Sequence, residues 1–117
     1  MKTTEIKTHY VVRLSLKTIE TLDKFAPPSE RERSRWIRGA IEDYLCKNHP
    51  RDYVKSRSHA RKIGNDKARI YKQIGLVLNK QNLVLLKYQH PEVSITVVIE
   101  QAIIDKTKAI FQLLQPA

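Results

Sequence analysis

The 117-residue chain has little cysteine, little glycine and no long apolar run, and each shortage excludes a class of protein. Its one cysteine, Cys46, allows neither an internal disulfide framework nor a cysteine-rich zinc site. Three glycines are too few for a glycine-rich phosphate loop. No apolar run approaches the roughly 20 residues of a membrane span, and the polar Lys2–Glu5 start is unlike a secretory signal. We therefore expect a cytoplasmic protein with no membrane partner.

Signatures of catalysis are also missing from the sequence. No acid–base pair and no nucleophile–base pattern stands out along the chain. His49, His59 and His90 are scattered and lack the spacing of metal ligands. We expect no enzymatic activity, no cofactor and no metal site.

Acidic residues are few: the chain has 22 lysines and arginines but only 12 aspartates and glutamates, so its formal net charge is +10. A small basic chain either binds a polyanion or carries a solvated, lysine-rich surface. Composition alone leaves both interpretations open. The apolar share of 41% is that of a folded domain rather than a disordered one.

A strand–helix–helix pattern occupies the first part of the chain. Residues 8–16 alternate between apolar and polar side chains, which predicts a half-buried strand. Ser15 is a favoured N-cap for the helix that follows, and Pro27-Pro28 ends that helix. Ser29 begins a capping box and a second helix, whose apolar stripe runs over Trp36–Leu45.

The same pattern returns in the second half of the chain. Residues 72–78 alternate again, and Asn79 takes the capping position of Ser15 at an offset of 64 residues. The β-branched run at 94–99 is also typical of a strand. We predict a helix there because Glu100–Ala102 continue its pattern and because the repeat requires it. The residues of both strands that we expect to face the core are Tyr10, Val12, Leu14, Ile74, Leu76 and Leu78.

The repeat predicts a mainly α fold with a two-stranded antiparallel β-ribbon. The first copy covers 1–48, a basic linker covers 49–70, and the second copy with a C-terminal helix extension covers 71–117. Neither copy is long enough to bury a stable core alone. We expect the two strands to pair within one chain and to form a single-chain pseudo-dimer; pairing between the strands of two chains is the alternative.

Three segments carry a resemblance to a known family. Tyr10–Ser15, Arg33–Leu45 and, more weakly, Val93–Thr96 resemble ribbon-helix-helix regulators of the MetJ/Arc/CopG type. The two tandem copies in one chain are similar to tandem regulators of archaeal viruses. The resemblance implies a sequence-specific transcription regulator, of a repressor family, that binds double-stranded DNA through the major groove, in the host cytoplasm if the chain is viral.

The same resemblance implies which residues contact DNA. The base-reading residues on the outward face of the two strands are His9, Val11, Arg13, Gln73, Gly75 and Val77. The phosphate-binding residues at the start of each second helix are Arg33, Ser34, Arg35, Ser94 and Thr96.

The chemistry of these side chains suits the implied role. Arg13 can pair with guanine O6 and N7, and Gln73 can pair with adenine N6 and N7. Val11 and Val77 suit a thymine methyl group, while Gly75 allows either a close backbone approach or a bulge. The two outward triplets differ, so we expect a DNA site without two-fold symmetry.

Other interpretations remain open at this point. Each outward polar side chain could simply be solvated, and the chain could instead be an antitoxin-like module that binds a protein partner, or a nonspecific DNA-coating protein. The last helix, from Ile95 to Leu114, is apolar on several sides, which is typical of a helix buried by more than one neighbour. We therefore expect self-association through this C-terminal helix.

Overall fold

The computed structural model describes residues 6–26, 29–55 and 70–114. Within these residues a strand–helix–helix unit occurs twice, so the chain is mainly helical with a two-stranded antiparallel sheet. The elements in chain order are β1 (Lys7–Ser15), α1 (Leu16–Phe25), α2 (Glu30–Leu45), β2 (Tyr71–Asn79), α5 (Lys80–Gln89) and α6 (Ile95–Leu114). Pro27-Pro28 and most of the expected basic linker, at 56–69, lie outside the described residues.

The helices begin where the capping residues predict. The Ser15 hydroxyl accepts the Thr18 N–H at 3.2 Å, and the Ser29 hydroxyl accepts a first-turn N–H of α2 at 3.2 Å. Asn79 holds the start of α5 in the same way, with an oxygen to nitrogen distance of 3.0 Å. The β-branched run that could have formed a strand is helical, because Val98 and Ile99 are buried in the core on one face of α6.

The two strands pair with each other along their whole length. Lys7 lies opposite Asn79 at one end, and Ser15 lies opposite Tyr71 at the other. Hydrogen bonds extend the ladder past both ends, from Leu16 N–H to the Ile70 carbonyl at 2.9 Å and from Lys80 N–H to the Ile6 carbonyl at 2.8 Å. These two bonds are related by the 64-residue offset of the repeat, so each unit supplies an equivalent contact.

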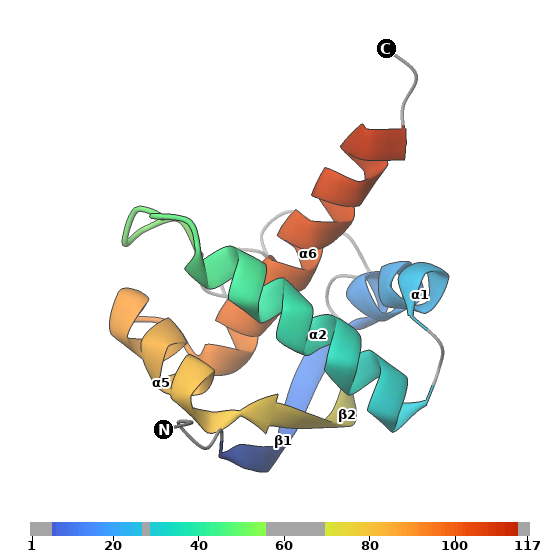
Figure 1. Cartoon of the computed structure of the whole chain (residues 1–117), viewed down its shortest axis with the longest axis horizontal. Helices are drawn as coiled ribbons and strands as arrows, with labels where there is room; N and C mark the ends of the chain where they lie inside the picture. The colour runs from blue at the N-terminus through green and yellow to red at the C-terminus, as the bar shows by residue number, and fades with distance from the viewer. Residues whose placement is uncertain (1–5, 27–28, 56–69, 115–117) are drawn as a thin grey trace, which may run out of the picture.

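One core lies between the ribbon and the helices. In Figure 1 the ribbon forms one side of the molecule, α2 crosses over it, and α6 passes behind α2. The buried cluster combines inward strand residues with residues of all four described helices. Its fully buried members include Val12, Leu14, Leu22, Ile37, Leu76, Leu78, Leu86, Ile99 and Ile103. Both units therefore contribute to the same apolar interior.

No helix in the described ranges is both long enough and apolar enough to cross a membrane. The 20-residue α6 comes closest in length, but charged Glu100, Asp105 and Lys106 interrupt it. Its first four turns face the core, and its last turns leave the body of the molecule (Figure 1).

A cluster of aromatic and histidine rings joins the segment after α2 to His90, the residue that ends α5. His90 is buried, with Nδ1 3.2 Å from the Arg51 carbonyl and Nε2 2.6 Å from the Tyr44 hydroxyl. Because a carbonyl can only accept, Nδ1 donates to it and Nε2 accepts from the hydroxyl. The His49 ring stacks against both Tyr44 and Tyr53, at centroid distances of 4.0 and 4.4 Å. Burial is the main reason why the pKa of His49 is lowered from 6.5.

This lowered pKa predicts a loss of stability in mild acid. Below about pH 6.5, His49 binds a proton in the unfolded chain more readily than in the folded chain, where its pKa is lower. The free energy of unfolding is therefore highest above pH 6.5 and decreases as the pH falls toward the folded-state pKa. We expect the melting temperature to decrease when the pH is lowered from about 7.5 to about 5.5. His49→Gln should make this decrease smaller. His9→Gln, on the exposed ribbon face, is the control. An unchanged slope in His49→Gln would contradict the assignment.

Candidate nucleic-acid interface

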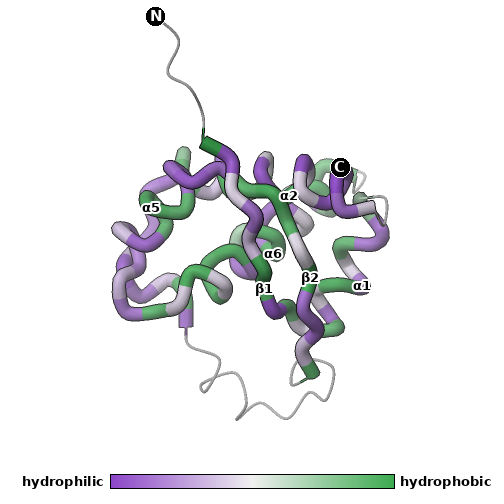
Figure 2. The backbone as a smooth tube through the Cα atoms, turned by 90° about the horizontal axis from the view of Figure 1, so that it is seen from below, coloured by the Kyte–Doolittle hydropathy of each residue, from purple (hydrophilic) through white to green (hydrophobic). Residues whose placement is uncertain are grey.

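The six outward residues of the ribbon form three directly opposed pairs. His9 lies opposite Val77, Val11 opposite Gly75, and Arg13 opposite Gln73. All six alternate with the core residues, so they share the face that points away from the helices. Figure 2 looks onto this face, where the two strands lie across the middle with α5 and α1 on opposite sides. The structure thus brings together the whole set of expected base-reading residues.

The centre of this face is exposed to solvent and carries few side-chain atoms. Val11 is 62% exposed, and its partner Gly75 adds no side chain. The pairing runs without interruption through Gly75, so the bulge considered from the sequence is absent from the ribbon. Bare backbone therefore lies beside Val11 at the middle of the exposed face.

The two ends of the face differ in chemistry. Val11 and Gly75 are equivalent positions of the two units, 64 residues apart, and they also lie opposite each other in the ribbon. Exchanging the two units therefore leaves this pair in place, so it marks the middle of the ribbon. On one side lie Arg13 and Gln73, which together offer a cation, an amide donor and an amide acceptor. On the other side lie His9 and Val77. An asymmetric ligand is the better chemical match for such a face.

Helices of each unit hold the strand of the other unit. The Val77 N–H donates to Ser34 Oγ at 2.9 Å, and the Val77 carbonyl accepts from Arg38 Nη1 at 2.7 Å. Across the repeat, the Ser15 N–H donates to Glu100 Oε2 at 2.8 Å. These bonds satisfy backbone groups at strand edges that the ladder does not reach. The ribbon is thereby fixed in place against the helices.

The structure changes the interpretation of Ser34, which the sequence placed among the phosphate contacts. Its side chain is buried and its hydroxyl accepts the Val77 N–H. The position one helical turn into α2 faces β2 rather than solvent. Ser34 therefore acts as an anchor of the ribbon and leaves the set of candidate phosphate ligands.

Removing this anchor should destabilise the protein. Ser34→Ala leaves the Val77 N–H without its acceptor, which we expect to lower the free energy of unfolding by about 1–3 kcal/mol in urea denaturation. The control is Thr21→Ala, because that hydroxyl only donates to the Lys17 carbonyl on the surface of α1. Equal stability of Ser34→Ala and the wild type would show that the bond contributes nothing.

The remaining candidate phosphate ligands differ in accessibility. Arg33 forms an ion pair with Asp23 of α1, and its side chain is only 17% exposed. Arg35 is exposed on α2. Ser94 is exposed at the start of α6, where its hydroxyl accepts the Val97 N–H, and Thr96 is partly buried. Arg35 and Ser94 are therefore the members of the set that solvent, and a ligand, can reach best.

Sequence reasoning missed two charged neighbours of the ribbon, Arg38 and Glu30. Arg38 recurs with Arg31 and Arg35 at the spacing of one helix face, a signal that the sequence contains. Arg38 binds the ribbon backbone and Arg31 is exposed. Glu30 could not be found from the sequence: its carboxylate lies 4.0 Å from His9 Nδ1 and 4.0 Å from the position of a side chain at Gly75. A negative charge thus borders a face whose six outward residues include one fixed cation, Arg13.

Among the residues that the structure describes, no three histidine, cysteine, aspartate or glutamate side chains gather as a metal site would require. Cys46 is a free, exposed thiol.

Comparisons with known proteins add no relative. No protein-family model, curated protein sequence or solved structure matches this chain.

Proposed function

We propose that this protein is a sequence-specific regulator that binds double-stranded DNA by placing its ribbon in the major groove. The observation that carries the proposal is the exposed face of three cross-strand pairs, backed by helices that fix its position. A two-stranded ribbon fits the major groove, which is about 12 Å wide and displays a different donor and acceptor pattern for each base pair. The net charge of +10 suits a polyanion.

In this proposal Arg13 and Gln73 provide most of the sequence discrimination. They lie opposite each other, so they reach neighbouring bases at one end of the site. Arginine pairs with guanine and glutamine with adenine through two hydrogen bonds each. Val11 at the centre and Val77 at the other end contact thymine methyl groups.

The two units act as the two halves of a single-chain pseudo-dimer. The ladder and its terminal hydrogen bonds follow the repeat, and α2 and α6 each contact the strand of the other unit. The halves are unequal. An offset of 62 residues relates α2 to α6, as in Trp36 and Val98, and it matches Arg31 to Val93 just before α6 and Arg35 to Val97 on α6. We infer that phosphate contacts concentrate at the start of α2 and that the preferred DNA site lacks two-fold symmetry.

The decisive experiment selects bound duplexes from random DNA and maps the enriched site by footprinting at two salt concentrations. We expect one enriched, asymmetric sequence, protection in the major groove, and a logarithm of the affinity that falls linearly with the logarithm of the salt concentration. Equal affinity for selected and random DNA would favour a nonspecific DNA-coating protein. Absence of binding at low salt would overturn the proposal and favour the antitoxin-like, partner-binding alternative.

Glu30 predicts a substitution that strengthens binding. Its carboxylate borders the proposed groove-facing surface and repels phosphates. We expect Glu30→Gln to raise the affinity for any duplex by about fivefold at low salt, with a smaller gain at high salt. Glu42→Gln, an exposed carboxylate farther along α2, is the matched control. Unchanged or weaker binding in a titration of Glu30→Gln would place DNA elsewhere.

A further inference from the structure

The end of α6 extends beyond what the core requires. At the 62-residue offset, the last residue of α2, Leu45, corresponds to Thr107, yet α6 continues to Leu114. Thr107 is also the last buried residue of α6. The extra turns expose large apolar side chains: Leu113 is 84% exposed and Leu114 72%, while Phe111 packs edge-on against Phe25 of α1 and is 46% exposed. Such a patch is typical of a surface that another molecule covers.

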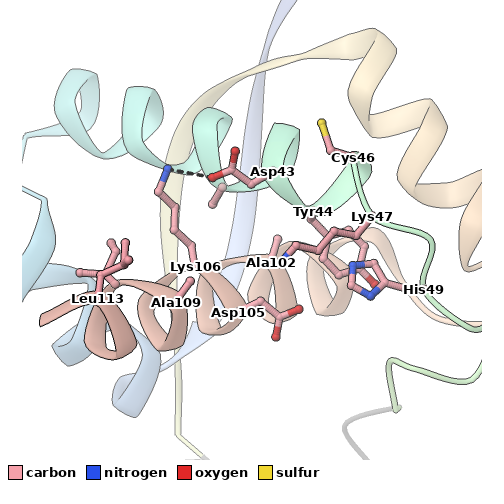
Figure 3. Close-up of a pocket in the computed structure, with 12 residues that line it drawn as sticks. Asp43, Tyr44, Cys46, Lys47, His49, Ala102, Asp105, Lys106, Ala109 and Leu113 are labelled. Atoms are coloured by element: carbon pink, nitrogen blue, oxygen red, sulfur yellow. Dashed lines mark hydrogen bonds and ion pairs between the residues drawn. The ribbon is translucent and has the colours of Figure 1, made fainter. Parts of the chain in front are cut away.

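A groove lies beside this extension on the same surface. Its volume is about 370 Å³, and it is bounded by the second half of α2 and by α6. Ala40 and Ala102, both buried, leave room at its base. Figure 3 shows Leu113 at one end of the groove and His49 at the other. A protruding leucine and an alanine-based groove thus share one face.

The charges around this groove balance, although the chain as a whole is strongly basic. Asp43 and Asp105 contribute two carboxylates, and Lys47 and Lys106 contribute two ammonium groups. Lys106 Nζ lies 3.4 Å from the Asp43 carboxylate, across the groove (Figure 3). When two copies meet at this surface, carboxylates of one copy can lie opposite ammonium groups of the other. Surfaces of the chain that carry only positive charge repel a second copy.

We propose that this groove and the end of α6 bind a second copy of the same chain through a two-fold contact. In such a contact the same patch serves both partners, so Leu113 of each copy enters the groove of the other. The exposed apolar side chains are buried and the carboxylates lie near lysines of the partner. Because the extension leaves the body on the side away from the ribbon, the contact keeps the outward ribbon face open (Figure 1).

The test is the mass of the full chain in solution over a wide concentration range, measured by sedimentation. We expect the wild type to approach twice the 13.7 kDa mass of one chain as its concentration rises. Leu113→Asp and Ala109→Arg, which alter the protruding leucine and the groove separately, should each keep a single-chain mass at every concentration. Tyr88→Asp is the matched control, because Tyr88 is also 84% exposed but lies on α5.

Two results would overturn the proposal. One is a wild-type chain that stays single at all concentrations, which would assign this face to a different protein. The other is a Leu113→Asp variant that associates as the wild type does. Circular dichroism of each variant confirms that the fold is retained, so a loss of mass reports the contact itself.

Discussion

Replacing Arg13 with alanine is expected to remove most of the sequence discrimination while leaving much of the nonspecific DNA binding. A bidentate arginine–guanine pair discriminates against a wrong base by about 1–3 kcal/mol, a factor of about 5 to 150. Nonspecific affinity comes from the sum of phosphate contacts, so the loss of one base-reading side chain changes it little. The measurement is the ratio of affinities for the selected duplex and a scrambled duplex, at one salt concentration.

Lys7→Ala is the matched control for Arg13→Ala. Lys7 is exposed on the outward face of the same strand and carries the same charge, but it has no planar donor fork. We expect Lys7→Ala to weaken binding to both duplexes equally and to reduce the salt slope by about one. If Arg13→Ala also weakens both duplexes equally, Arg13 contacts phosphate and does not read a base.

Alanine at either of two equivalent core leucines is expected to lower the stability of the whole chain in a single transition. Leu22 of α1 and Leu86 of α5 are related by the 64-residue offset, and both are 0% exposed. A buried leucine replaced by alanine costs about 2–5 kcal/mol, which is a large part of the 5–15 kcal/mol typical of a domain. Since both side chains belong to one cluster, neither unit can unfold without exposing the other.

Urea denaturation followed by circular dichroism and by tryptophan fluorescence distinguishes one core from two. Trp36 is the one tryptophan and lies in the first unit, so fluorescence reports that unit while ellipticity reports both. We expect the two signals to coincide in the wild type, in Leu22→Ala and in Leu86→Ala. Val84→Ala, at a side chain of α5 that is 61% exposed, is the control and should change little. Two separate transitions would refute a shared core.

The sequence predicted the local structure of this protein well. The N-caps at Ser15, Ser29 and Asn79 are confirmed by hydrogen bonds to first-turn N–H groups. The alternation separated most inward from outward side chains, although outward Val77 is half-buried, as inward Tyr10 and Ile74 are. Both signals depend on neighbours within a few residues, which is why one sequence suffices to find them.

The candidate site was predicted less completely, because burial of a polar side chain depends on distant elements. Ser34 lies one turn into α2 and Ser94 directly precedes α6, yet Ser34 is buried against β2 and Ser94 is exposed. Arg33 has the sequence context of a phosphate ligand, but packing against α1 pairs it with Asp23. No spacing rule distinguishes these cases.

By itself, the amino-acid sequence determined the repeat, the helix starts and the two faces of each strand, since these follow from periodicity and short-range hydrogen bonding. Only the tertiary structure decided that the strands pair within one chain, with Val11 opposite Gly75, and that Glu30 borders their exposed face. Contacts between segments that lie far apart in the sequence depend on how the whole core packs. No local pattern encodes that packing, and the chemistry of the ribbon face depends on it.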